Sequence, residues 1–231
     1  MGAIRAIELS NVYVAYAGSG KPALHSVSLS VELGKLVVVT GPNGAGKTTL
    51  VETCLGLLKP VSGSAKLLGV DTRSTQISRV RRRCGYLPQN FMRPPSEAYT
   101  ARHVIAMGLA SLKRVLEPLT ISDLERIERV ARELGIEDLL DRPLGRLSGG
   151  QQQRVFLARV FVREPLVAFL DEPFSSLDPE ARSVVASYIR RYVDEKRATV
   201  VVVSHVLEPL EELADMVVEL RDGRVARVRS R

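Results

Sequence analysis

Three groups of residues in this sequence have the types and the spacing that could carry chemistry. The first is the run Gly41-Pro42-Asn43-Gly44-Ala45-Gly46-Lys47-Thr48-Thr49, which matches the pattern G-x-x-x-x-G-K-[ST]. Its glycines would let successive backbone N–H groups converge on phosphate oxygens, and a helix that begins at the end of the run would add positive potential. Lys47 would reach the β- and γ-phosphates of a nucleotide, and Thr48 would hold Mg²⁺ through its hydroxyl.

Two carboxylates form the second group. Asp171 and Glu172 directly follow the apolar run Leu166–Leu170. Open α/β sheets bind ligands at the carboxyl ends of their strands, so both side chains would lie near the phosphate loop. Asp171 could hold Mg²⁺ directly or through water, and Glu172, which points in a different direction, could polarise an attacking water. The alternative is that these two residues are an ordinary acidic strand end with no role in binding. The presence of the phosphate loop makes this alternative less favoured.

The third group consists of a histidine and a second glycine turn. His205 follows the apolar run Thr199–Val203, so it would reach the same edge of the sheet and could sense a γ-phosphate. The run Leu147-Ser148-Gly149-Gly150-Gln151 precedes a helical pattern. Ser148 would cap this helix and leave N–H groups free for an anion, although the local chemistry alone supports only the cap.

The elements that position these groups follow from hydrophobic periodicity. Residues 3–40 favour β structure, and within them Val27, Leu29 and Val31 alternate with polar residues. Further strands are predicted at 36–40, 166–170 and 199–203, and short strands and turns at 60–90. Helices are predicted at 47–58, 101–113, 122–134, 148–163 and 179–197.

Caps and turns set the expected ends of these elements. Ser122 and Glu125 have the spacing of a capping box, and Gly135 would end that helix. Asp178 followed by proline would open the helix that ends near residue 197. Asp222–Gly223 predicts a hairpin turn between strands at 216–220 and 224–228. The order of elements predicts an α/β fold with a helical segment inserted at about 90–163.

The composition limits the classes of protein to which the chain can belong. It has 231 residues, 45% of them apolar, which is enough for one large domain with a substantial core. Its apolar runs are only strand-length, so neither a membrane-spanning helix nor a signal peptide is expected. Cys54 and Cys84 form no metal-binding or disulfide pattern, which favours the cytosol. His25 and His103 are expected to be structural.

In this order and at this spacing, the motifs resemble those of the ATP-binding subunit of ABC transporters, over essentially the whole chain. The segment 41–49 resembles Walker A, VAFLDE resembles Walker B, and LSGGQ, which separates this family from other phosphate-loop ATPases, resembles the signature motif. Gln89 matches the Q-loop, Asp178 the D-loop and His205 the switch histidine. Tyr16 matches the aromatic residue that stacks on adenine, with Tyr13 as the second choice.

The resemblance implies a fold, a mechanism and partners. It implies a phosphate-loop ATPase core with a mixed sheet at about 1–89 and 164–231, an antiparallel N-terminal β part, and the helical subdomain at 90–163. Two copies would pack head to tail, with each ATP between the phosphate loop of one and Ser148 to Gln151 of the other, and Asp178 would link the two sites. Lys47, Gln89, Glu172 and His205 would be catalytic, and Gln89 would also contact Mg²⁺.

Finer features of the motifs narrow the resemblance further. QQQRVFLAR, DEPF and ARHVIAMGL are similar to the ATPases of zinc or manganese importers and of iron-chelate importers. The implied partners are a membrane permease that docks on the helical segment and a solute-binding protein, with the chain at the cytoplasmic face of the membrane. Another cargo or an exporter stays open. The net charge of +7 could suit nucleic acid. The chain has a single cassette, and Walker A lies close to LSGGQ in the sequence. Both features argue against a nucleic-acid partner.

Overall fold

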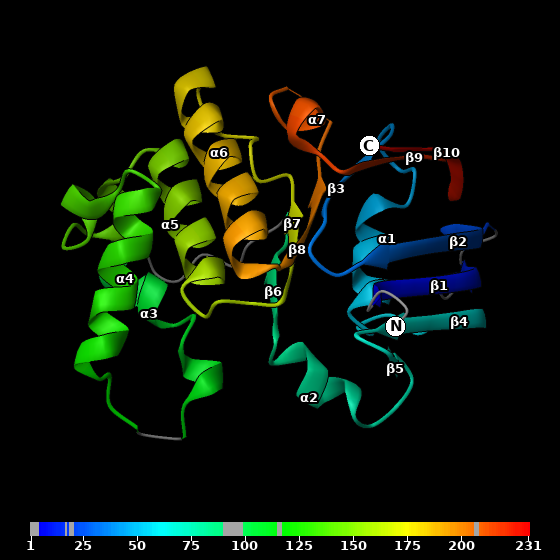
Figure 1. Ribbon diagram of the computed structural model, residues 1–231, viewed down its shortest axis with the longest axis horizontal. Helices are drawn as coiled ribbons and strands as arrows, with labels where there is room; N and C mark the ends of the chain where they lie inside the picture. Colours follow the sequence, from blue (N-terminus) through cyan, green and yellow to red (C-terminus); the bar gives the residue numbers. More distant parts are fainter. Residues whose placement is uncertain (1–4, 17, 19–20, 90–98, 115–116, 206–207) are drawn as a thin grey trace.

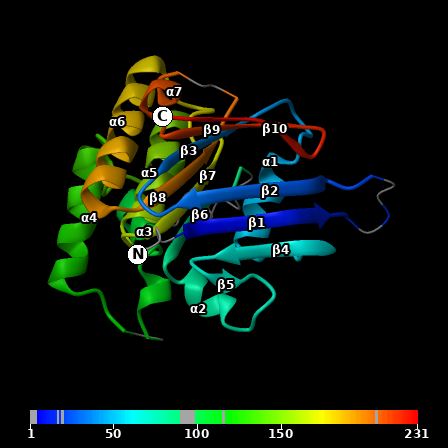
Figure 2. The same cartoon turned by 45° about the vertical axis from the view of Figure 1, so that its right-hand side comes forward.

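The computed structural model describes residues 5–16, 18, 21–89, 99–114, 117–205 and 208–231. The described chain forms two sheets, drawn in Figures 1 and 2. The first is antiparallel, with strand order β2-β1-β4-β5. Its strands are β1 (Arg5–Val14), β2 (Leu24–Glu32), β4 (Ser62–Leu67) and β5 (Val70–Asp71). This is the antiparallel β part that the sequence predicts.

The second sheet is mixed and has strand order β10-β9-β3-β8-β7-β6. Its strands are β3 (Leu36–Thr40), β6 (Cys84–Leu87), β7 (Val167–Asp171), β8 (Thr199–Val203), β9 (Met216–Arg221) and β10 (Arg224–Ser230). All neighbours pair in parallel except the β9–β10 hairpin. In this hairpin Asp222 and Gly223 both have positive φ, at 49° and 72°, as the predicted tight turn requires.

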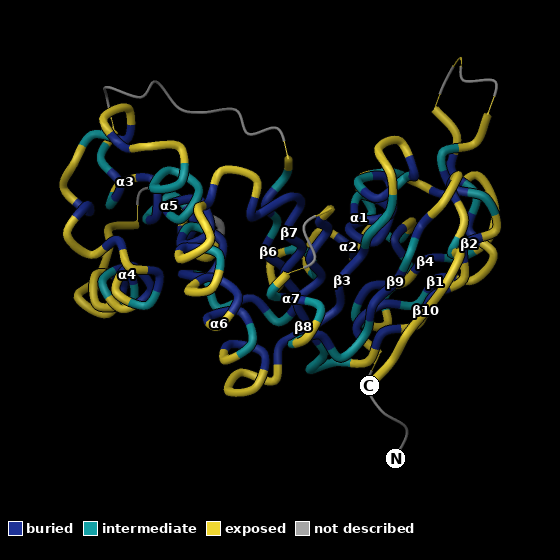
Figure 3. Tube along the Cα trace, turned by 90° about the horizontal axis from the view of Figure 1, so that it is seen from above, coloured by how far each residue is buried: buried dark blue, intermediate teal, exposed yellow. Residues whose placement is uncertain are grey.

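Side chains on the mixed sheet alternate between two cores because successive residues of a strand face opposite sides. Val38 and Val202 join a core with the helices at residues 101–193, whereas Val39 and Val203 join a core with helix α1 and the antiparallel sheet. Strands β7 and β8 are buried along their full length, and Figure 3 shows the central strands in dark blue. The strand ends that carry the candidate site are therefore held by packing on both faces.

The helices divide between these two sides of the mixed sheet (Figure 1). Helix α1 (Lys47–Cys54) lies toward the antiparallel sheet, and α3, α4, α5 and α6 lie on the other side. Within the described ranges, the other helices are α2 (Ile77–Arg81), α3 (Ala101–Ala106), α4 (Ile121–Glu133), α5 (Gly149–Phe161), α6 (Pro179–Lys196) and α7 (Leu210–Leu213). Single 3₁₀ turns occur at Ala110–Leu112, Glu137–Leu139 and Leu144–Arg146. No helix among the described residues is long and apolar enough to cross a membrane.

Several helix ends differ from the sequence prediction. The capping box of α4 consists of Thr120 and Asp123, not Ser122 and Glu125. Asp123 accepts from the Thr120 N–H at 2.7 Å and also lies 2.7 Å from Lys113, so an ion pair favours this earlier start. Helix α1 ends at Cys54 instead of residue 58, because Gly56 takes a positive φ of 66°.

Other differences concern short elements. The helix predicted at 101–113 is broken into α3 and a 3₁₀ turn, and the sequence pattern does not reveal α2 or α7, which have only five and four residues. The predicted beginning of the inserted helical segment, at 90–98, lies outside the described residues, as do residues 3 and 4 of the first β region. The predicted stop at Gly135 is confirmed by its positive φ of 65° after α4.

Candidate active site

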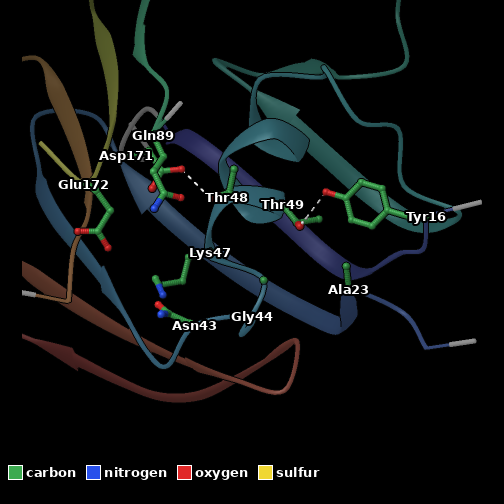
Figure 4. Close-up of a pocket in the computed structure, with 11 residues that line it drawn as sticks. Tyr16, Ala23, Asn43, Gly44, Lys47, Thr48, Thr49, Gln89, Asp171 and Glu172 are labelled. Atoms are coloured by element: carbon green, nitrogen blue, oxygen red, sulfur yellow. Dashed lines mark hydrogen bonds between the residues drawn. The ribbon is translucent and has the colours of Figure 1, made fainter. Parts of the chain in front are cut away.

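A pocket of about 390 Å³ lies at the carboxyl ends of β3 and β7 and at the start of α1, in the volume range of small-molecule sites. Figure 4 shows Tyr16 at one end of it and Asp171 and Glu172 at the other, with the glycine loop between them. Its described lining is formed by Tyr16, Ala23, Asn43, Gly44, Gly46, Lys47, Thr48, Thr49, Gln89, Asp171 and Glu172. The structure thus brings together most of the residues that the sequence assigns to the phosphate loop, the carboxylates and the Q-loop.

The glycine loop has a shape that other residues would not adopt. Gly41, Gly44 and Gly46 have φ values of 144°, 77° and 95°. A Cβ on Gly41 would lie 2.1 Å from the carbonyl oxygen of Leu220, and one on Gly46 would lie 2.5 Å from that of Ala23. Gly46 is also the N-cap of α1 and places no side chain over the first-turn N–H groups of the helix. The loop therefore leads its backbone into a helix start of the kind that binds phosphate.

The side chain of Lys47 stabilises this loop by hydrogen bonds to its backbone. Its Nζ donates to the carbonyl oxygens of Gly41 and Pro42 at 2.9 and 3.0 Å, and the residue is only 8% exposed. Gly41, Pro42 and Ala45, which the sequence also assigns to the phosphate loop, are not among the described residues that line the pocket. Ala45 is buried, and its carbonyl accepts from Gly223. These three residues contribute to the shape of the loop.

Thr48 and Asp171 meet at the other end of the pocket. The Thr48 Oγ1 donates to Oδ2 of Asp171 at 2.6 Å, and Asp171 is 2% exposed. Burial raises the pKa of Asp171; the bond from Thr48 opposes this shift, and the charge of Glu172 adds to it. Burial and the charge of Asp171 also raise the pKa of Glu52, which lies one turn after Thr48 in α1. Three carboxylates thus concentrate negative potential here.

This end of the pocket fits Mg²⁺. Mg²⁺ prefers oxygen ligands and is bound in nucleotide sites through one or two protein groups together with phosphates. The hydroxyl of Thr48 and the carboxylate of Asp171 adjoin, and Gln89 lines the same pocket. Among the residues that the structure describes, no group of three His, Cys, Asp or Glu side chains could form a metal cage. A site that shares its ion with phosphates requires no such cage.

Glu172 and His205 form a pair that the sequence analysis does not foresee. Nδ1 of His205 lies 2.8 Å from Oε2 of Glu172. Glu172 has a positive φ of 53°, uncommon for a residue with a side chain, and its N–H donates to the carbonyl of Val203 at 2.8 Å. The backbone thereby turns sharply after β7 and directs the Glu172 side chain toward the residue that follows β8 and Ser204. The nearly buried carboxylate meets a largely exposed imidazole.

Tyr16 reaches the pocket from the loop after β1. Its Oη lies 3.1 Å from Oγ1 of Thr49, a contact between residues that are 33 positions apart. Tyr16 is 47% exposed, whereas Thr49 is buried in the first turn of α1. Tyr13, the second candidate for the base contact, packs instead on His25 with ring centroids 4.8 Å apart. The geometry therefore favours Tyr16 over Tyr13, as the sequence analysis does.

The signature residues lie outside this pocket. Ser148 is the N-cap of α5, as predicted, and forms a capping box with Gln151: the N–H of Gln151 donates to Oγ of Ser148 at 3.2 Å, and the N–H of Ser148 donates to Oε1 of Gln151 at 2.9 Å. A Cβ on Gly150 would lie 2.9 Å from the Ser176 carbonyl oxygen, and one on Gly149 would meet the Ser176 side chain. Asp178 caps α6, accepting from Ala181 at 2.8 Å. Ser148 to Gln151 and Asp178 are not among the residues that line the pocket.

Comparison with known proteins gives one consistent answer. A family model described as ABC transporter matches residues 24–175. The manganese transport system ATP-binding protein MntB of Bacillus subtilis is 36% identical over 220 residues, which are 95% of this chain and 85% of MntB. The thiamine import ATP-binding protein ThiQ of Shigella flexneri is 38% identical over 200 residues, which are 86% of this chain and 82% of ThiQ.

Solved structures agree with the sequence comparisons. The dimeric structure of MJ0796, a bacterial ABC transporter cassette, has a TM-score of 0.87 at 27% identity. The alignment covers 97% of this chain and 98% of the MJ0796 chain. The same cassette in a post-hydrolysis state bound to ADP and Pi also has a TM-score of 0.87, at 26% identity and the same coverage. The expected fold class, a phosphate-loop ATPase core with a mixed sheet, is confirmed. Because the family model spans more than half of the chain and relatives match it almost end to end, this protein belongs to the ABC transporter family as an ATP-binding subunit that hydrolyses ATP.

Proposed function

We propose that two copies of this chain close head to tail around two MgATP molecules, and that hydrolysis reopens them to drive uptake through a membrane permease. One observation carries this proposal: the pocket contains the phosphate loop and the carboxylates, whereas the exposed Ser148 helix start lies elsewhere on the chain. A second copy would bring its Ser148 to Gln151 onto the triphosphate, with Asp178 near both sites. The dimer of MJ0796 supports this arrangement.

In this proposal, the residues of one pocket divide the work along the nucleotide. Tyr16 contacts the adenine, and the glycine loop and Lys47 bind the β- and γ-phosphates. Thr48, Asp171 and Gln89 hold Mg²⁺, which would neutralise charge on the phosphate oxygens when bound. The contacts that support this division are the 2.6 Å bond between Thr48 and Asp171 and the position of Tyr16 at the opposite end.

Glu172 is the proposed general base, and His205 its partner. Glu172 is nearly buried beside the Mg²⁺ ligands, so it can take a proton from a water aligned with the γ-phosphate. His205, which lies 2.8 Å from Glu172, would orient this carboxylate and contact the γ-phosphate. Loss of the γ-phosphate would remove contacts from Lys47, from His205 and from the partner copy's helix start, so the dimer would open.

A second pocket supports the docking of a permease on the helical side. This pocket has a volume of about 480 Å³, is largely apolar, and is lined by Tyr99, His103, Ala106, Met107, Ala110, Lys113, Arg114, Glu117 and Leu119. Leu112, beside this lining, and Leu119, within it, are exposed apolar side chains. An amphipathic helix at the inner face of the membrane protein would cover them. The site of action is then the cytoplasmic face of the membrane.

We propose a metal ion or a metal chelate as the cargo, delivered by a solute-binding protein. The similarity to the manganese transport protein MntB supports this cargo. The similarity to the thiamine import protein ThiQ favours a second candidate, an organic cation. The ATP-binding subunit does not contact either cargo, so the permease and the binding protein determine which one is transported.

The test is to copurify the chain with its permease, reconstitute the complex in liposomes, and measure ATP hydrolysis with candidate binding proteins. We expect stimulation by a binding protein loaded with Mn²⁺, Zn²⁺ or an iron chelate, and none with the Lys47→Ala variant, because that variant lacks the phosphate-binding cation. Stimulation by a thiamine-loaded protein instead would overturn the metal cargo but retain the importer. A chain that hydrolyses ATP but never copurifies with a membrane protein would contradict the transport function.

A further inference from the structure

The hydroxyl of Tyr16 is bound to the phosphate loop, which simple stacking on a base does not require. A ring that only stacks offers its face, and phenylalanine would serve equally well. Here Oη of Tyr16 lies 3.1 Å from Oγ1 of Thr49, and Thr49 is 6% exposed in the first turn of α1 (Figure 4). One hydrogen bond thus joins the aromatic end of the pocket to the phosphate end.

The side chain of Tyr16 needs such an anchor. Tyr16 follows β1, and its loop returns to β2 at Leu24, where the Ala23 N–H donates to the Val14 carbonyl at 2.7 Å. That bond closes the base of the loop but leaves the ring to be placed by its own contacts. The ring is 47% exposed. A half-exposed tyrosine loses rotamer freedom when a ligand binds, unless the free protein already fixes the ring.

We infer that Thr49 is a positioning residue for nucleotide binding: its hydroxyl holds Tyr16 through Oη, so that the ring is already oriented when the base arrives. The inference rests on the proposed contact between Tyr16 and adenine and deepens it. Thr49 itself is held in place, because Thr53 Oγ1 donates to its carbonyl at 2.7 Å and it lies in the turn that begins at Gly46. Thr49 therefore links base binding to the helix start that binds phosphate.

The test measures the binding of two ligands by isothermal titration calorimetry with Mg²⁺: the non-hydrolysable analogue adenylyl imidodiphosphate and inorganic tripolyphosphate. Tyr16→Phe keeps the ring and Thr49→Val keeps the shape, and each removes one partner of the bond. We expect each to weaken binding of the adenine nucleotide by roughly three- to tenfold, the equivalent of one net hydrogen bond. Tyr16→Phe, which leaves the phosphate loop unchanged, should bind tripolyphosphate like the unmodified protein. The double variant should be no weaker than either single variant, because both remove the same bond.

Two further variants separate this role from a structural one. Thr49→Ser restores the hydroxyl and should restore nucleotide affinity. Tyr13→Phe removes a hydroxyl from β1 at a ring that packs on His25, outside the pocket lining, and should bind both ligands like the unmodified protein. If Tyr16→Phe binds the nucleotide like the unmodified protein, or if it binds both ligands more weakly by the same factor, the inference is wrong. Failure of the unmodified protein to bind the nucleotide would instead overturn the proposed function.

Discussion

Nδ1 of His205 lies 2.8 Å from Oε2 of Glu172, although the two residues follow different strands of the mixed sheet. The contact exists because β7 and β8 are parallel neighbours with Asp171 opposite Val203, so the residues beyond their carboxyl ends meet at one edge. The left-handed backbone at Glu172 completes it by turning the carboxylate toward the imidazole. The proposed base and its proposed partner are therefore brought together by the pairing of two neighbouring strands.

Replacement of Glu172, the proposed base, should stop ATP hydrolysis but not ATP binding. Glu172→Gln preserves the size of the side chain but cannot accept a proton, so we expect phosphate release to fall by about 10²- to 10⁴-fold. ATP affinity should persist, because Lys47 and the glycine loop are unchanged. Size-exclusion chromatography with MgATP should show a stable dimer for this variant, whereas the Lys47→Ala variant should remain monomeric. Hydrolysis at the unmodified rate would refute the assignment of Glu172 as base.

Loss of the imidazole should act through the same carboxylate. His205→Ala removes the side chain that contacts Glu172 and is proposed to orient it, and we expect slower hydrolysis with a smaller loss than for Glu172→Gln. Residues that act as a unit are not additive, so the double variant should lose less activity than the product of the two single losses. Single-turnover phosphate release measures all three variants. Fully additive losses would mean that His205 and Glu172 work independently, in spite of their contact.

The glycine loop provides a matched pair of substitutions. Gly44 and Gly46 both have positive φ, at 77° and 95°, but a Cβ on Gly44 would meet nothing within 4 Å, whereas one on Gly46 would lie 2.5 Å from the Ala23 carbonyl oxygen. Gly44→Ala should cost about 1 to 2 kcal/mol of unfolding free energy, from backbone strain alone. Gly46→Ala should cost clearly more, because the backbone must also shift. Urea denaturation without nucleotide tests this; equal costs would mean that the loop relaxes freely.

Elements with strong local signals are the ones that the sequence predicts well. The run LVVVT can be buried on both faces and forms β3, and Asp178 followed by proline caps α6 because this chemistry is local. The short helices α2 and α7 escape prediction, since four or five residues hold too little periodicity. In α4, Thr120 with Asp123 and Ser122 with Glu125 both offer a cap, and the Lys113 ion pair, which no local pattern encodes, favours the first.

In the candidate site, too, some features are predictable from local sequence and others are not. The phosphate loop, Asp171 and Glu172 are predictable because each follows an apolar run, and strand ends of a parallel sheet converge. The contact of Tyr16 with Thr49 and that of Glu172 with His205 each join residues 33 positions apart and depend on side-chain directions. The sequence indicates which groups approach this edge of the sheet, but only the packed structure determines which of them form pairs.

Low pH should destabilise the edge of the mixed sheet that lies opposite the candidate site, through protonation of Asp215. Burial would raise the pKa of this carboxylate, but the N–H of Leu36 at 2.7 Å and the guanidinium of Arg190 at 2.9 Å outweigh it and lower the pKa below its ordinary value of 3.8. The unfolded chain therefore takes up a proton first as the pH falls. The stabilisation by ionised Asp215 is complete well above pH 3.8 and is lost as the pH falls from there through the lower folded pKa.

Asp215→Asn should then cost about 1 to 3 kcal/mol at pH 7, the usual value for hydrogen bonds to a charged group. The cost should shrink as the pH approaches 3, so the variant should show a flatter decline in stability than the unmodified protein. Urea denaturation across this pH series measures both. Asp138→Asn, at an exposed carboxylate in the 3₁₀ turn before Leu140, serves as the control and should parallel the unmodified protein. A pH-independent cost of Asp215→Asn would show that shape, and not charge, makes this residue stabilising.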